Sequence, residues 1–268
     1  MIHHGKRNVL GVSIDAMDYE SAVAKILECA RSGKRCTTTA LAVHGLTMAA
    51  LDRQQQFRLN SFDLAVPDGQ PVRWALNLLY DVGLRTRVYG PKLMILVCQQ
   101  AALQRIPVFF YGSREVVLHD LCERMPHTCP GLQIAGFQAS RFRSLTRPEH
   151  RDLVKRIAGS GARILFAGLG CPRQEIFAYE MGEYLNMPIL AVGAAFDYHA
   201  GILREPPSLI QDFGLQWLYR LLQEPRRLWR RYLIQNAEFV TLFILQWMGL
   251  WRPNVRNGQP PPTEMLYG

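Results

Sequence analysis

Four arginines lie close together near the C-terminus, within the segment QEPRRLWRRYLIQ. They are Arg226, Arg227, Arg230 and Arg231. On a helix, at about 100° per residue, they would fall within roughly 140° of one another, opposite an apolar arc that contains Trp229. Guanidinium groups bind phosphate oxygens through charge-assisted hydrogen bonds. The segment therefore predicts an amphipathic helix whose basic face is solvated, meets an anionic membrane surface or binds substrate phosphates.

Polar side chains also follow three short apolar runs, in the segments VPDGQPV, GLGCPRQE and VGAAFDYHAG. Asp68 in the first is either a turn residue, which the Pro-Asp-Gly context favours, or a carboxylate that accepts a proton from a substrate hydroxyl. Asp197 in the third either caps the next segment or binds a hydroxyl. The second is either a plain strand-to-helix turn or a site where backbone N–H groups, followed by Arg173, Gln174 and Glu175, meet the polar groups of a ligand.

The same motifs argue against two kinds of cofactor. GLGCPRQE has Arg173 at the place of the third glycine of a dinucleotide fingerprint and lies far from the first strand, which disfavours a nicotinamide cofactor. His44 and His199 have no carboxylate or cysteine at metal-ligand spacing. The chain also lacks Asp-x-Asp, the pair with which many nucleotide-sugar enzymes hold a divalent ion. We therefore expect no cofactor and no metal site, and expect arginines to supply the positive charge.

The charge of the chain is uneven. Among 268 residues, 31 lysines and arginines exceed 22 acidic residues and give a formal net charge of +9, which favours phosphorylated or polyanionic partners. Residues 214–256 hold seven arginines and two glutamates, so this stretch alone contributes +5. Because the chain shows no nucleic-acid-binding motif and no basic stripe elsewhere, we expect no nucleic acid partner.

Cysteine usage and hydropathy indicate the compartment. The six cysteines include no C-x-x-C pair and no metal-ligand spacing, which is typical of reduced thiols in a cytoplasmic protein. The segment MIHHGKRNVLGV lacks the apolar core of a signal peptide, and no apolar run reaches the roughly 18 to 20 residues that span a bilayer. We expect a protein that does not cross a membrane.

The elements that must position these residues follow one local pattern. A short apolar run ends in glycine and passes into a helical pattern, which is typical of an open α/β sheet. The predicted strands are residues 63–66, 107–111, 163–167 and 187–192, and the predicted helices are residues 16–30, 49–59, 114–125 and one that begins near Pro172. We expect an α/β body over residues 1–210, a helical appendage over residues 211–251 and a disordered tail, rich in Pro, Gly and Asn, over residues 252–268.

Together, four segments resemble the WecG/TagA/CpsF family of bacterial glycosyltransferases: VPDGQPV, GLGCPRQE, VGAAFDYHAG and GLQWLYRLLQEPRRLWRRYL. The likeness runs from about Val9 to Trp247, and the last segment is the most specific. The resemblance implies a Rossmann-like α/β fold whose C-terminal appendage completes the active site at the membrane. It also implies inverting, metal-independent transfer of a sugar from a UDP-sugar to a polyprenyl-diphosphate-linked saccharide.

By position, the resemblance assigns Asp68 as the general base and Gln174 and Asp197 as pocket residues. The tail arginines that contact the nucleotide diphosphate in the family match Arg220, Arg227 and Arg230. The full predicted substrate-binding set is Thr39, His44, Gly69, Arg87, Gly168, Arg173, Gln174, Glu175, Asp197, Arg220, Arg227 and Arg230.

Two departures from the family pattern bear on the substrate. Arg87 in RVYGPKL matches a family arginine, but Lys92 stands where relatives have an aspartate. The Thr-x-Asn of the family aligns with residues 40–42, which read Ala-Leu-Ala, so Thr39 or His44 would have to take over. These departures leave the identity of the donor and acceptor sugars open.

We therefore expect a UDP-sugar-dependent hexosyltransferase of surface polysaccharide biosynthesis, bound peripherally to the inner face of the plasma membrane. The sequence leaves open whether it forms a homo-oligomer. Two alternatives come from other classes. One is a nucleotide-dependent oxidoreductase. The other is a non-catalytic membrane or nucleic-acid adaptor carried by the basic tail, which predicts that Asp68 and Gln174 can be replaced without effect.

Overall fold

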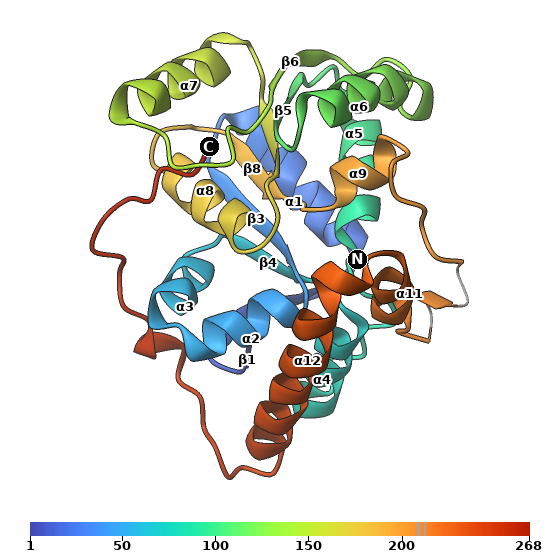
Figure 1. Ribbon diagram of the computed structural model, residues 1–268, viewed down its shortest axis with the longest axis vertical. Helices are drawn as coiled ribbons and strands as arrows, with labels where there is room; N and C mark the ends of the chain where they lie inside the picture. The colour runs from blue at the N-terminus through green and yellow to red at the C-terminus, as the bar shows by residue number, and fades with distance from the viewer. Residues whose placement is uncertain (208–209, 212) are drawn as a thin grey trace.

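The computed structural model describes residues 1–207, 210–211 and 213–268, without the side chains of Arg227 and Arg231. Six parallel strands form a central sheet in the order β4-β3-β8-β7-β5-β6 (Figure 1). They are β3 Cys36–Leu41, β4 Leu64–Pro67, β5 Val108–Gly112, β6 Ile134–Gln138, β7 Ile164–Gly168 and β8 Pro188–Ala191. Strands β5 and β7 are buried along their whole length, as expected for parallel strands covered on both faces.

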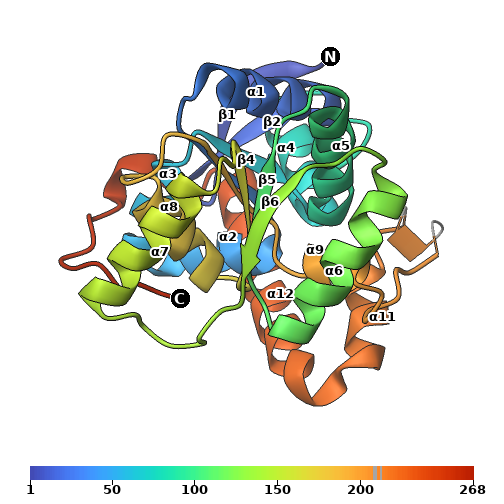
Figure 2. The ribbon, with the colours of Figure 1, turned by 90° about the horizontal axis from the view of Figure 1, so that it is seen from above.

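Helices cover both faces of the sheet (Figure 2). One face carries α1 Tyr19–Ser32, α5 Gly90–Leu103, α6 Glu115–Thr128 and α9 Ala195–His199; the other carries α2 Val43–Leu51, α3 Arg53–Asn60, α7 Arg147–Gly159 and α8 Arg173–Met181. Neighbouring residues of β5 point to opposite faces. Phe110 packs edge-on against Phe196 with ring centroids 5.7 Å apart, whereas Tyr111 stacks on Phe177 at 4.6 Å. This three-layer arrangement confirms the expected Rossmann-like α/β fold.

A β-hairpin lies beside the β4 edge of the sheet. It consists of β1 His3–Val9 and β2 Val12–Met17, and it packs with α4 Gln70–Tyr80. The carboxylate of Asp15 accepts a hydrogen bond from the backbone N–H of Ala65 at 2.8 Å. Burial raises the pKa of Asp15. The hairpin thus covers the β4 edge, which would otherwise present unpaired backbone groups.

The predicted strands and most predicted helices are confirmed, with two corrections. The first helix begins at Tyr19 rather than residue 16, because Asp18 caps it by accepting from the N–H of Ser21. The single helix predicted over residues 49–59 is the end of α2 followed by α3. Asp52 separates them, since its extended backbone and its hydrogen bonds from Gln54 and Gln55 start a new helix.

After the sheet, α11 Gln216–Gln223 and α12 Pro225–Trp247 form the helical appendage (Figure 1). Helix α12 packs on α2, α4 and α11 and buries Leu228 and Phe239. At its far end the side chain of Gln246 accepts from the N–H of Leu10 at 2.8 Å and donates to the carbonyl of Asn8 at 2.9 Å. None of the described helices has the length and apolar character needed to traverse a bilayer.

Residues 252–268, for which the composition predicts disorder, instead run back along the body past α3 and α8 (Figure 1). The segment includes the 3₁₀ turn η1 Val255–Asn257. Buried or half-buried polar side chains of the body hold its backbone: Gln56 and Asn60 donate to carbonyls of the segment, and the carboxylate of Glu180 accepts from two of its N–H groups, at 2.6 and 2.9 Å. Composition could not show these distant partners.

Candidate active site

The polar residues singled out in the sequence gather at one edge of the sheet. Asp68 directly follows β4, Thr39 lies in β3, Asp197 lies on α9 after β8, and Gln174 lies on α8 after β7. Because β4, β3, β8 and β7 are consecutive neighbours, their carboxyl ends meet at this edge. In open α/β sheets ligands bind outside the carboxyl ends of the strands.

Asp68 is held beside Arg87. The N–H of Asp68 donates to the carbonyl of Leu41, and the N–H of Val88 donates to the carbonyl of Pro67, so both loops are fastened to the strand ends. A guanidinium nitrogen of Arg87 lies 3.9 Å from Oδ1 of Asp68 and 3.3 Å from its backbone carbonyl. The Asp68 side chain is 19% exposed, which leaves the carboxylate accessible from the sheet edge.

Two glycines flank this part of the site, and one of them, Gly90, lies against the carboxylate. Gly69 follows Asp68 as the N-cap of α4. At Gly90 an added Cβ would lie 3.6 Å from Oδ2 of Asp68 and 3.2 Å from the side chain of Ala40. Any side chain at residue 90 would therefore occupy the space next to the predicted base.

A buried polar cluster links β3 to α8. The carboxylate of Glu175 accepts from Nε2 of Gln174 at 2.9 Å and from Oγ1 of Thr39 at 3.2 Å. Burial raises the pKa of Glu175, although the two hydrogen bonds oppose this shift. Glu175 and Thr39 are almost completely buried, and the side chain of Cys171 also contacts the Glu175 carboxylate. The Oε1 atom of Gln174 has no hydrogen-bond partner in the part of the chain that the structure describes, and it lies toward Gly193, where an added Cβ would be 3.2 Å away.

Arg220 on α11 approaches the same edge from the appendage. Its guanidinium lies 3.0 Å from the carboxylate of Glu224 and 5.7 Å from the ring centre of Tyr198. Burial lowers the pKa of Arg220, but Tyr198, Tyr232 and Glu224 raise it by more, so the group stays charged. Its Nε atom is buried and has no hydrogen-bond partner among the described residues.

Two tyrosines that the sequence reasoning did not single out connect Arg87 with Arg220. The guanidinium of Arg87 lies 4.5 Å from the ring centre of Tyr89, and the Tyr89 and Tyr198 rings meet edge-on at 6.3 Å. Arg87 also donates to Oε1 of Gln211 at 3.3 Å. Tyr89 lies in the motif RVYGPKL and Tyr198 in the motif FDYHAG. Their presence in these two motifs is the only feature of the sequence that links them to the site.

Other predicted residues lie in different surroundings. His44 on α2 contacts Gln235 of α12 through Nδ1, so it joins the appendage to the body. Gly168 packs under the ring of Phe196, where a Cβ would come within 2.5 Å. The backbone carbonyl of Asp197 accepts from the N–H groups of Ile202 and Leu203.

The structure describes the side chains of three further basic residues, Arg173, Arg230 and Lys92, but not that of Arg227. The exposed Arg173 lies 5.7 Å from the ring centre of Tyr267 in the C-terminal segment. Arg230 is exposed over the ring of Trp229, at 5.3 Å, whereas the side chain of Arg227 lies outside the described part of the chain. Lys92, which replaces the family aspartate, has Nζ 5.1 Å from the ring centre of Tyr19.

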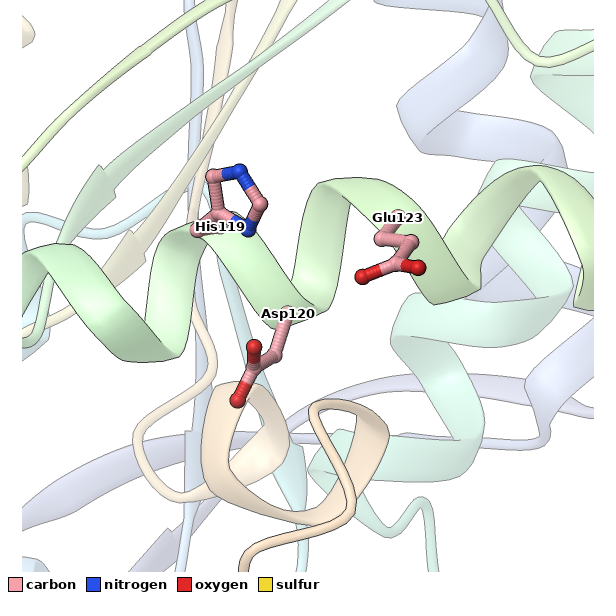
Figure 3. A group of neighbouring side chains, drawn as sticks. All are labelled: His119, Asp120 and Glu123. Atoms are coloured by element: carbon pink, nitrogen blue, oxygen red, sulfur yellow. The ribbon is translucent and has the colours of Figure 1, made fainter.

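One group of side chains on α6 has ligand atoms close enough for a metal ion, within 4.8 Å of one another. It consists of His119, Asp120 and Glu123 (Figure 3). His119 and Glu123 are exposed, and all three come from consecutive turns of one helix. It is the only such group among the described residues, and it includes none of the predicted site residues.

Comparisons with known proteins identify the family of the chain. The chain belongs to the glycosyl transferase WecG/TagA/CpsF family, whose model matches residues 7–253. A similar protein is the N-acetylglucosaminyldiphosphoundecaprenol N-acetyl-beta-D-mannosaminyltransferase of Bacillus spizizenii (strain ATCC 23059 / NRRL B-14472 / W23). The two are 32% identical over 184 residues, which is 68% of each chain. Family membership confirms a glycosyltransferase and disfavours the oxidoreductase and adaptor alternatives.

Proposed function

We propose that the protein transfers a hexose or hexose derivative from a UDP-sugar to a polyprenyl-diphosphate-linked saccharide, with inversion and without a metal ion, in surface polysaccharide biosynthesis. The name of the Bacillus relative supports a lipid-linked acceptor, because that protein acts on N-acetylglucosaminyldiphosphoundecaprenol. The observation that carries the proposal is the accessible Asp68 carboxylate beside Arg87, at the ligand-binding edge of a glycosyltransferase of this family.

In the proposed reaction a hydroxyl of the acceptor donates its proton to the Asp68 carboxylate while its oxygen attacks the anomeric carbon of the donor sugar. The bond from that carbon to the diphosphate oxygen breaks, and UDP leaves with the electron pair. Attack from the opposite side inverts the anomeric configuration. Arg220 provides a fixed positive charge near this edge, and two or three guanidinium groups, with Arg227 and Arg230, would offset the roughly two negative charges of the departing diphosphate.

Replacing Asp68 with asparagine tests the role of the base. Asparagine keeps the shape and the turn but cannot accept the proton, so transfer should fall by roughly 10²-fold or more while UDP affinity changes little. The assay is mass spectrometry of a lipid-linked acceptor incubated with a panel of UDP-sugars. Asp81→Asn is a matched control, because Asp81 is an exposed residue at the other end of α4. Near-normal turnover of Asp68→Asn would reduce Asp68 to a turn residue.

The outer face of α12 supports membrane association. Its exposed apolar residues recur every three to four positions along much of the helix: Trp229, Leu233, Val240, Ile244 and Trp247. Each is more than two-fifths exposed, and basic residues lie at the start of the same helix. An apolar stripe with adjacent basic residues is typical of helices that lie in the interface of anionic bilayers. We infer that the appendage holds the enzyme on the inner face of the membrane that carries its acceptor.

The membrane contact is tested with the full chain carrying Trp229→Ser and Trp247→Ser. Both side chains are about half exposed, so the unfolding temperature should change little while sedimentation with anionic liposomes is lost. Leu103→Ser at the end of α5 is the control, since Leu103 is 77% exposed and lies outside the appendage. Unchanged sedimentation, or self-association of the native chain that covers α12, would contradict the inference.

A further inference from the structure

Tyr89 and Tyr198 form a continuous series of contacts between the two ends of the site. Asp68 pairs with Arg87, Arg87 lies over Tyr89, Tyr89 meets Tyr198, and Arg220 of the appendage lies over Tyr198. The series joins the loop before α5, helix α9 and helix α11. The two tyrosines therefore lie between the proposed base and the arginine proposed to meet the diphosphate.

Among the described residues, the hydroxyl groups of this pair lack a hydrogen bond of normal geometry. Tyr89 is 8% and Tyr198 is 7% exposed, and neither hydroxyl oxygen has a hydrogen-bond partner in the described structure. The two hydroxyls interact directly with each other, and each contributes to the shift in the pKa of the other, but their contact falls short of normal hydrogen-bond geometry. Burial raises the pKa of both, so they stay protonated at neutral pH. A buried polar group without a partner costs free energy, and a phenylalanine would avoid that cost.

The charges around the pair favour a neutral ligand over a further anion. Arg87 and Arg220 already lie over the two rings, and Asp68 faces Tyr89 closely enough to raise its pKa. The carboxylate of Glu205 raises the pKa of both tyrosines, so negative charge is already present on both sides. A phenol both donates and accepts hydrogen bonds, as does the hydroxyl of a sugar, whereas guanidinium groups only donate.

We infer that Tyr89 and Tyr198 position the transferred sugar, by hydrogen bonds from their hydroxyl groups to its hydroxyl or amide substituents. The inference rests on the proposed function, in which Asp68 meets the acceptor and Arg220 meets the diphosphate. The anomeric carbon that moves from one to the other must pass between them, beside this pair. Substituents of that sugar would satisfy the two buried hydroxyls, which makes the pair a determinant of the donor sugar.

A purely structural role makes a different prediction. If the pair only fills space between α5, α9 and α11, the hydroxyl groups contribute nothing, and phenylalanine should serve as well. The changes Tyr89→Phe and Tyr198→Phe keep both rings and their contacts with Arg87 and Arg220. They remove only the unsatisfied oxygens, so the unfolding temperature should stay the same or rise.

The experiment measures thermal unfolding, UDP affinity and kcat/KM for whichever UDP-sugar of the panel the native protein transfers. Each variant should retain UDP affinity and lose about tenfold in kcat/KM, the effect of one hydrogen bond to substrate, without loss of stability. Tyr184→Phe is the matched control, because its hydroxyl donates to Glu264 on the far side of the molecule.

Two results would overturn the inference: unchanged kcat/KM in both variants, or an equal fall in affinity for UDP, which would place the hydroxyls on the diphosphate. If the native protein transfers no sugar from the panel, the proposed function fails and the inference fails with it. If the native protein transfers a sugar and both variants have the same kcat/KM as the native protein, only the inference fails.

Discussion

Glu175 offers the sharpest test of how the site is built. Its carboxylate is the shared acceptor for Gln174 and Thr39, and its second oxygen has no hydrogen-bond partner of normal geometry among the described residues. Glu175→Ala would leave two buried donors without a partner. At about 1 to 3 kcal/mol for each unsatisfied group, the free energy of unfolding should fall by about 2 to 6 kcal/mol. Glu175→Gln keeps an acceptor oxygen and the shape, so it avoids this loss.

The pH dependence of the Glu175→Gln comparison has a definite sign. Burial raises the pKa of Glu175 above its ordinary value of 4.5, so above pH 4.5 the folded protein holds this proton more tightly than the unfolded chain does. Stability therefore falls as pH rises from 4.5 toward the folded-state pKa. Glutamine has no proton to lose. The variant should gain stability relative to the native protein across this range, and the gain should level off above the folded-state pKa.

Urea unfolding of the native protein and both variants, at several pH values between about 5 and 8, measures these differences. Burial also raises the pKa values of Asp15 and Glu180. Both residues are present in every protein compared, so their contributions cancel in the difference in stability between variants. Glu183→Gln is the control, because Glu183 is an exposed residue just after α8. A pH-independent gap between Glu175→Gln and the native protein, or equal destabilisation by glutamine and alanine, would refute the reasoning.

Three further outcomes are expected. Transfer should persist in excess EDTA, because guanidinium groups are available to the diphosphate and the chain lacks Asp-x-Asp; loss restored by Mg²⁺ or Mn²⁺ would contradict this. Gly193→Ala should reduce kcat/KM by about tenfold or more, since φ is +56° there and the new Cβ would lie 3.2 Å from Oε1 of Gln174; native kinetics would argue against a role for that oxygen. Glu180→Ala should release the C-terminal segment, seen as faster limited proteolysis after Trp251 than in Glu183→Ala.

Local pattern was sufficient for much of the fold. Strands β4, β5, β7 and β8 are short apolar runs bounded by turn residues. The turn that follows each run marks the carboxyl end of the strand. The positions of Asp68 and Gln174 at the carboxyl edge of the sheet followed from that pattern, because parallel strands place all their carboxyl ends on one side. The long amphipathic helix α12 also followed, since its periodicity is contained within one segment.

Local pattern was insufficient where the conformation or the contacts of a residue depend on residues far away in the sequence. The C-terminal segment reads as disordered because its own composition buries little, yet Gln56 and Glu180 from the body satisfy its backbone. Tyr89 and Tyr198 lie more than a hundred positions apart, and neither looks unusual in its own segment. They meet because strand β8, formed late in the chain, inserts between β3 and β7 and brings α9 beside the loop after β4. Strand order depends on packing across the whole chain, so only the tertiary structure could decide which motifs share the site.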